Sequence, residues 1–185
     1  MIVPGMFAGR SPGLPSLERR DARADWTAWA RAAAVPLVVF EVAVERGNYP
    51  PGDERLAWLL AGAFAAAALS LLFLRGRGWS AAAGLVLDVV VASAFVALYS
   101  FEAGTTARHV LLLPVVEGAF LFGLRAGALL PLASLPALAF FEWRQAERLD
   151  LHPFDIGHVL GPAGIQLAVG IVIGALVARL ERRGV

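Results

Sequence analysis

The sequence predicts an all-α polytopic membrane protein, a bundle of six transmembrane helices with both chain ends on the cytoplasmic side. Of its 185 residues, 58% are hydrophobic and 17% are charged, whereas soluble domains average about 45–50% and about 25%. A soluble domain of this length has no core large enough to bury so much apolar surface. Apolar stretches follow one another along the chain, and arginines concentrate on alternate connections between them.

The chain begins with a segment rich in proline, glycine and charge, residues 1–25. This segment lacks the apolar run and small-residue cleavage site of a secretory signal. We therefore predict a cytoplasmic tail over 1–25, a membrane domain over 26–178 and a cytoplasmic helix exit over 179–185.

Six apolar stretches form the predicted membrane domain. They cover residues 26–44, 56–74, 80–101, 110–124, 126–143 and 159–178. A helix needs about 20 residues to cross the hydrocarbon layer, and backbone groups in lipid must be satisfied within a helix. The first stretch is long enough if Arg31 lies at the interface. The fourth is short and contains Pro114, so we expect a thin, kinked or partly re-entrant span.

The arginines predict the orientation of the bundle. With the N-terminus inside, eleven arginines fall on the cytoplasmic side and five on the outer side, as the positive-inside bias requires. The five tryptophans lie near predicted span ends, where an interfacial aromatic belt would place them. They are Trp26, Trp29, Trp58, Trp79 and Trp143.

Glu41, Asp88 and Glu117 lie within the predicted spans, where an ionisable group costs about 2.5–3.5 kcal/mol. Glu41 is close enough to the outer end of the first helix to reach the interface. Asp88 and Glu117 are deeper, and we expect both to face the bundle interior, either protonated or paired. The available partners are Arg31, Arg125 and Gln166. A helix–helix hydrogen bond that fixes the packing is the favoured role, and a ligand or proton site is the alternative.

The sixth stretch contains a polar residue and a line of small residues. Gln166 is expected to form a hydrogen bond between helices. Gly170 and Gly174 allow a second helix to approach closely. That helix belongs either to this bundle, which we favour, or to a second copy in a homodimer.

The three histidines fall on the predicted outer side, two of them in the run HPFDIGH. His109, His152, Asp155 and His158 are therefore candidates for an outward-facing metal or pH site. The favoured interpretation is an ordinary loop, in which Asp155 caps the last helix.

The sequence lacks the common motifs of enzymes and of nucleotide- or metal-binding proteins. It contains no phosphate-binding loop, no GxSxG, no HExxH and no cysteine, so we predict no catalytic residue, no cofactor and no enzymatic activity. The net charge of +1 predicts no nucleic-acid partner. The predicted partner common to all interpretations is the lipid bilayer.

Residues 50–183 resemble the multi-pass N-terminal input region of bacterial sensor histidine kinases, especially actinobacterial ones, and similar regions that precede diguanylate cyclases. The resemblance lies in Leu87-Asp88, in LLLPVVEGAFLFGLRAGALL over 111–130 and in the segment 141–183 with its PFD motif and Arg-rich helix exit. It implies that Glu117, Asp155 and Gln166 belong to an input module. It also implies a cytoplasmic kinase or cyclase after the last helix. The sequence has no phosphoacceptor helix or ATP-binding motif, so we expect a truncated sensor region or a stand-alone six-helix protein.

These observations predict a signal-input module in the inner (plasma) membrane of a bacterium. It would pass a stimulus through its last helix to a cytoplasmic signalling protein or output domain. The first alternative is a substrate-capture or other small-solute transport subunit, which the short loops and the FG-x-R-x-G turn also fit. The second alternative is a structural subunit of a membrane complex.

Overall fold

The computed structural model describes residues 14–74, 76–101, 106–149 and 153–183, which form helices and short connections without a strand. The α-helices are α1 (Leu14–Val44), α2 (Asp53–Phe73), α3 (Ser80–Leu98), α4 (Leu112–Phe122), α5 (Leu124–Leu149) and α6 (Gly157–Arg182). Short 3₁₀ helices lie between them: η1 (Glu45–Gly47), η2 (Tyr99–Phe101) and η3 (Thr106–Leu111). The all-α prediction is confirmed for these residues.

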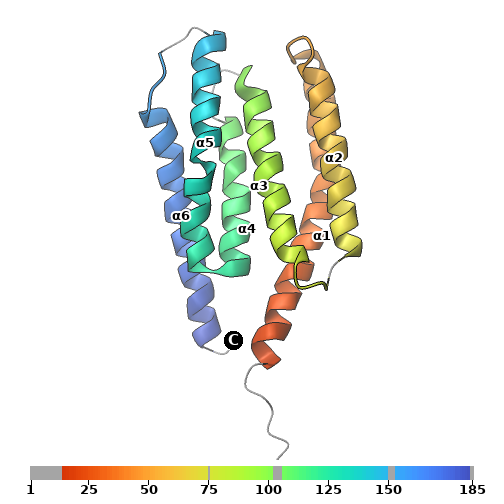
Figure 1. The fold of residues 1–185 in the computed structure, drawn as a ribbon, viewed down its shortest axis with the longest axis vertical. Helices are drawn as coiled ribbons and strands as arrows, with labels where there is room; N and C mark the ends of the chain where they lie inside the picture. The colour runs from red at the N-terminus through yellow and green to blue at the C-terminus, as the bar shows by residue number, and fades with distance from the viewer. Residues whose placement is uncertain (1–13, 75, 102–105, 150–152, 184–185) are drawn as a thin grey trace, which may run out of the picture.

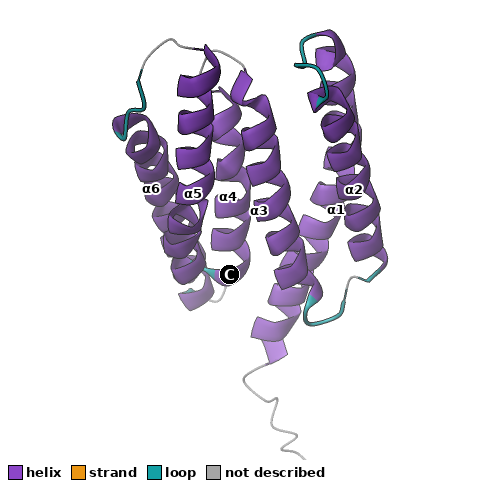
Figure 2. Ribbon diagram, turned by 45° about the horizontal axis from the view of Figure 1, so that its top comes forward, coloured by secondary structure: helices purple, strands orange, loops and turns teal. Residues whose placement is uncertain are grey.

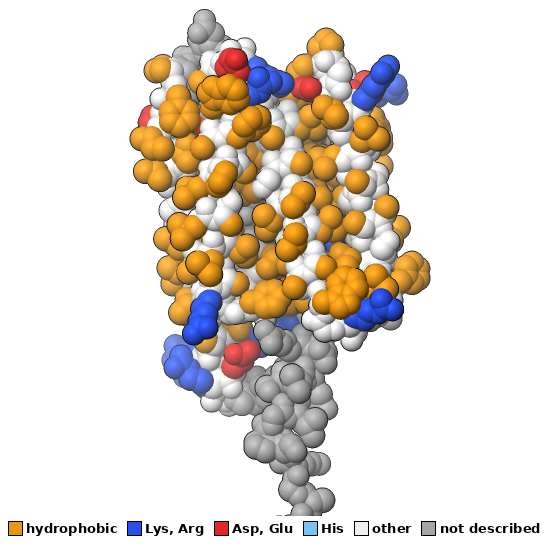
Figure 3. All heavy atoms as spheres, viewed as in Figure 1, with side chains coloured by type: hydrophobic (Ala, Val, Ile, Leu, Met, Phe, Trp, Pro, Cys, Tyr) orange, Lys and Arg blue, Asp and Glu red, His pale blue; other side chains and the backbone are white. Residues whose placement is uncertain are grey.

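Five of the described helices are long and apolar enough to cross a membrane: α1, α2, α3, α5 and α6. Large apolar side chains such as Leu59, Phe73 and Val172 are more than 60% exposed along them. On the face shown in Figure 3, hydrophobic side chains cover the middle of the bundle, and charged side chains gather at its two ends. This distribution is that of a multi-pass membrane protein, because lipid covers the apolar belt.

The fourth apolar stretch is the exception. Its helix, α4, has 11 residues and is therefore about 16 Å long, about half the hydrocarbon thickness. Pro114 lies in the first turn of α4, where its missing N–H leaves no bond unmade, so it begins the helix and does not kink it. The 3₁₀ helix η3 directly precedes α4 and lengthens this segment of the bundle.

Two helices extend beyond their predicted limits. α1 begins at Leu14, so residues 14–25 of the predicted cytoplasmic tail are helical. Pro15 is tolerated because it lies in the first turn. α5 continues to Leu149, so the first part of the predicted loop 144–158 is also helical.

The helices run alternately up and down, with α1 and α2 as an antiparallel pair beside the group α3–α6 (Figures 1 and 2). The described ends, Leu14 and Arg183, lie at the same end of the bundle, which we call the inner end (Figure 1). This agrees with the prediction that both termini share one side. The orientation in the membrane stays a prediction.

At the outer end, the α1–α2 pair joins the rest of the bundle through side chains near its turn. The hydroxyls of Tyr49 and Tyr99 lie 2.6 Å apart, and Phe101 stacks on Tyr99 with a ring separation of 5.6 Å. Arg148 of α5 donates to Asp53 of α2 over 3.2 Å. Nearer the inner end, α1 contacts α3, α4 and α6 through charged side chains.

Candidate functional site

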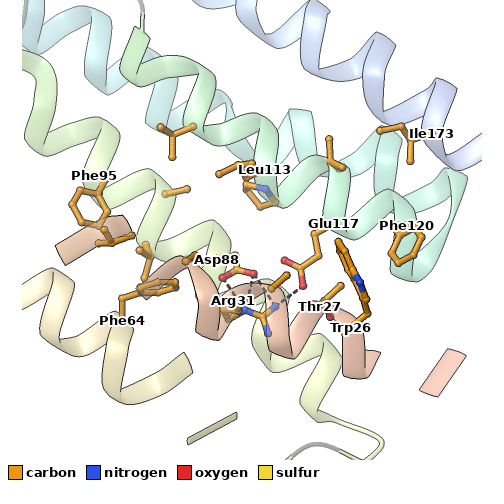
Figure 4. Close-up of a pocket in the computed structure, with 18 residues that line it drawn as sticks. Trp26, Thr27, Arg31, Phe64, Asp88, Phe95, Leu113, Glu117, Phe120 and Ile173 are labelled. Atoms are coloured by element: carbon orange, nitrogen blue, oxygen red, sulfur yellow. Dashed lines mark hydrogen bonds and ion pairs between the residues drawn. The ribbon is translucent and has the colours of Figure 1, made fainter. Parts of the chain in front are cut away.

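Three charged side chains from three helices meet in the inner half of the bundle. Arg31 of α1 donates from Nε to both carboxylate oxygens of Asp88 of α3, each at 2.9 Å. Its Nη2 lies 2.8 Å from Asp88 Oδ2 and also donates to Glu117 Oε1 of α4. Figure 4 shows the three side chains pointing toward one another. We call this group the charge triad.

The charge triad is largely withdrawn from the surface. The exposed fraction of the side chain is 4% for Arg31, 17% for Asp88 and 15% for Glu117. Gly84 of α3 makes room for the guanidinium, because a Cβ at this position would lie 2.5 Å from Arg31 Nη1. The sequence offered Arg31 as a partner of both acids, and the structure makes this pairing.

Arg31 is buried between helices, and the part of α1 that is long and apolar enough to cross a membrane begins nine residues before it, at Ala22. Arg31 is 6% exposed, and α1 continues from it for about five further turns toward the inner end, to Leu14. An arginine at this depth needs compensating carboxylates, and Asp88 and Glu117 provide them.

A cavity of about 700 Å³ adjoins the charge triad. Its walls come mainly from α1, α3 and α4, and Phe64 of α2 and Ile173 of α6 complete them. The other lining side chains include the aromatic rings of Trp26, Phe95 and Phe120 (Figure 4). Such a volume lies within the range of small-molecule sites, about 300–1,000 Å³.

The exposed part of the cavity lining comes from α1 and from the η3–α4 segment, and we therefore place the mouth of the cavity between them. Trp26 and Ala30 of α1 and Val110 and Leu113 of the η3–α4 segment line it and are exposed. Because the bundle surface here is apolar, the mouth faces lipid in a membrane. The geometry permits a lipophilic molecule to enter sideways and meet the charge triad.

Just beneath the cavity, Arg23 connects α1 to two other helices. Its Nη1 donates to Glu181 Oε1 of α6 over 2.9 Å and to the carbonyl of Phe120 of α4 over 3.4 Å. Its guanidinium also lies 5.5 Å from the centre of the Phe120 ring. The inner ends of α1, α4 and α6 are thus joined through one side chain.

A second polar cluster lies near the outer end, and it was not predicted. Arg108 of η3 donates from Nη2 to Glu142 Oε2 over 2.7 Å and to Gln145 Oε1 over 2.8 Å. Its Nη1 donates to the carbonyl of His158 over 2.8 Å. Arg108, Glu142 and Gln145 are all less than 5% exposed. Arg108 Nε has no hydrogen-bond partner among the described residues.

One signal in the sequence could have found this cluster. Glu142 and Gln145 are three residues apart and follow Leu138 and Phe141, so all four share a helix face if α5 continues past residue 143. Ending the helix at residue 143 assigned Gln145 to a loop. The partner, Arg108, lies in η3, and no pattern in the sequence predicts this 3₁₀ helix.

The polar and small residues predicted on the last helix serve contacts within the bundle. The buried Gln166 accepts a hydrogen bond from Ser134 Oγ of α5 over 2.7 Å, so its predicted interhelical bond is confirmed. A Cβ at Gly170 would collide with the carbonyl oxygen of Gly127, and one at Gly174 would lie 2.6 Å from Leu124 Cα. Both glycines therefore let α6 approach α5 closely.

The described candidates for the outer metal or pH site, His109, Asp155 and His158, do not form a three-ligand cluster. His109 is exposed, and His152 lies outside the described residues. Asp155 Oδ1 accepts the N–H of Gly157 over 2.8 Å, but the N-cap residue of α6 is Ile156 and it makes no side-chain cap hydrogen bond, so the predicted N-cap role of Asp155 is wrong. His158 Nδ1 lies 3.1 Å from Glu142 Oε1. In the described segments, no cluster of three His, Asp or Glu side chains is suited to a metal ion.

Comparison with protein-family models, curated proteins and solved structures finds no match to this chain. The resemblance to sensor input regions therefore stays a prediction.

Proposed function

We propose that this protein is a membrane-embedded signal-input module, in which a stimulus at the cavity moves α1 and thereby alters the inner end of α6. The observation that carries the proposal is the position of α1. It contributes Arg31 to the charge triad and Arg23 to the pair with Glu181. These two arginines are eight residues apart, about two helical turns.

The contact of Arg31 with the two carboxylates is expected to be stronger than that of Arg23 with Glu181. This difference allows a change at the first contact to alter the second. Removing one member of a buried charge group is costly because the others stay buried without compensation. An exposed ion pair such as Arg23–Glu181, with Glu181 56% exposed, contributes at most about 1 kcal/mol. A change at the charge triad is therefore large enough to break the inner-end contact and shift α6 between two arrangements.

The proposal is tested by measuring the distance between the inner ends of α1 and α6. The chain contains no cysteine, so spin labels attach only at introduced sites, here Ala22→Cys and Arg179→Cys. Both positions are exposed. In lipid nanodiscs, pulsed electron paramagnetic resonance should give a changed distance distribution in Glu117→Gln and Asp88→Asn.

The matched control is Glu41→Gln, because Glu41 is an exposed carboxylate on α1. It should leave the distribution unchanged. If the two triad variants are folded and give the same distribution as the unsubstituted protein, α1 does not link the cavity to α6 and the proposal fails.

A second candidate function is a substrate-capture or other small-solute transport subunit, and the cavity of about 700 Å³ favours it. Uptake of a solute by proteoliposomes, abolished in Glu117→Gln, would support transport over signalling. The third candidate, a structural subunit, has less support, because α5 already covers the Gly170 and Gly174 face.

A further inference from the structure

We infer that the cavity is a binding site for a lipophilic monovalent cation, such as an amine or a quaternary onium compound with apolar substituents. This inference rests on the proposed function in that it identifies the stimulus as a ligand of the same cavity. The observations that carry it are the charge balance of the charge triad, the nature of the walls and the position of the mouth.

The charge balance leaves one negative charge to be neutralised. Asp88 and Glu117 are the acidic side chains among the described residues that line the cavity, and Arg31 is the basic one. With both carboxylates ionised, the charge triad carries a formal charge of −1. An uncompensated charge at membrane depth is costly, so the site is expected to take up one proton or one cation.

Among the described residues, Arg31, Asp88 and Glu117 are the titratable groups that line the cavity. The side chains that α2 and α6 contribute to the lining are Phe64 and Ile173, which are apolar. Arg23 of α1 lies beneath the cavity and pairs with Glu181 of α6. A proton and a cation therefore compete for the same place beside the two carboxylates.

The walls favour a cation with a large apolar surface. Trp26, Phe64, Phe95 and Phe120 present aromatic rings to the cavity, and aromatic faces attract cations, quaternary ammonium groups in particular. Most of the remaining lining side chains are alanine, valine, leucine or proline. Small hydrated ions gain little from such walls, whereas lipophilic cations gain from both the rings and the apolar surface.

The guanidinium argues against an anionic ligand. Nε and Nη2 of Arg31 already donate to Asp88 and Glu117, and an anion would have to displace one of these carboxylates. It would also enter a site whose formal charge is already negative. The lateral mouth between α1 and α4 fits a molecule that first dissolves in the membrane.

Tetraphenylphosphonium is the probe for this site, and tetraphenylborate is its control, since the two ions have nearly the same shape and opposite charge. The full chain in nanodiscs of zwitterionic lipid is titrated with each ion, and binding to empty nanodiscs is subtracted. The phosphonium should bind saturably at one site per chain, and the borate should not. Saturable borate binding of equal strength would show that only hydrophobicity acts, and would overturn the inference.

Neutralising either carboxylate should remove the attraction for the cation. Asp88→Asn and Glu117→Gln should each weaken phosphonium binding by at least about tenfold, and Glu41→Gln should leave it unchanged. Unchanged affinity in both folded triad variants would contradict the inference. Absence of saturable phosphonium binding to the folded unsubstituted protein would do the same.

A measurement on the unsubstituted protein decides the matter if the variants do not fold. Because a proton competes with the cation, phosphonium affinity should fall as the solution is acidified from about pH 8 to about pH 5, and an affinity that stays constant would overturn the inference. If the cation does not bind while the α1–α6 distance still responds to Glu117→Gln, the input module stands and only the ligand class is wrong.

Discussion

Arg108 and Glu142 form an ion pair with Nη2 and Oε2 2.7 Å apart, and their side chains are 3% and 0% exposed. The pair ties η3 to α5, and through the His158 carbonyl it also reaches α6. It is the most deeply buried ion pair among the described residues. Its effect on stability is therefore separable from that of the charge triad.

Replacing Glu142 with Gln is expected to destabilise the bundle by about 3–5 kcal/mol, because Arg108 then stays buried without its counter-charge. Reversible unfolding in mixed micelles gives the free energy of unfolding. Arg144→Ala is the control, since the Arg144–Glu147 pair is partly exposed and should contribute at most about 1 kcal/mol. Equal stability of Glu142→Gln and the unsubstituted protein would mean that the ion pair does not form.

Replacing Gly170 with Ala is expected to destabilise the protein by about 1–3 kcal/mol, because the new methyl group forces α5 and α6 apart. Gly164→Ala on the same helix is the matched control, because a Cβ there meets nothing within 4 Å. It should be neutral or stabilising by up to about 1 kcal/mol. Thermal unfolding of the two variants, compared side by side, checks the prediction. Equal melting temperatures would argue against the close α5–α6 contact.

Replacing Gly84 with Ala should displace the Arg31 guanidinium from the surface of α3. The expected destabilisation is about 1–3 kcal/mol, and it should disappear when Arg31 is also replaced by Ala, because the methyl group then has free space. Such non-additivity is measured as a double-mutant cycle in the free energy of unfolding. Gly62→Ala, where a Cβ meets nothing within 4 Å, is the control. Additive effects of the two substitutions would mean that Arg31 does not pack on Gly84.

The predicted orientation is testable by labelling introduced cysteines in intact cells. A cysteine at Asn48, in the α1–α2 turn, should react with a membrane-impermeant maleimide from outside. Cysteines at Arg77 and Arg125, in the turns at the inner end, should react only after the membrane is permeabilised. All three positions are exposed. Reaction of position 125 from outside would show that the chain does not return across the membrane through η3 and α4.

The long apolar stretches were predictable because the thickness of the hydrocarbon layer sets their length. The inward placement of Asp88 and Glu117 followed from the same physics, since lipid disfavours charge. The predicted charge bias remains when the two arginines that are buried inside the bundle are left out. Arg31 and Arg108 are buried, and leaving them out of the two sides gives ten arginines against four, still in the predicted direction.

The depth of Arg31 was not predictable, because it depends on how far α1 extends toward Leu14. Nearby Trp26 and Trp29 are typical of an interface, and they concealed a residue that belongs to the interior. Glu142 was missed for a related reason. It lies within the predicted fifth stretch, one residue from its end, and its burial depends on η3 bringing Arg108 across from another part of the chain, which is tertiary information.

The charge triad imposes an order on biosynthesis. Arg31 is translated 57 residues before Asp88 and 86 before Glu117, so α1 reaches the membrane before α3 and α4 can follow it. Until α3 is inserted, a lone arginine would lie in α1 at a cost of about 2.5–3.5 kcal/mol at mid-membrane. The α1–α2 hairpin is therefore expected to remain at the translocon or the lipid surface, and to insert fully only when α3 and α4 are present. Integration of the N-terminal hairpin thus depends on residues encoded far downstream.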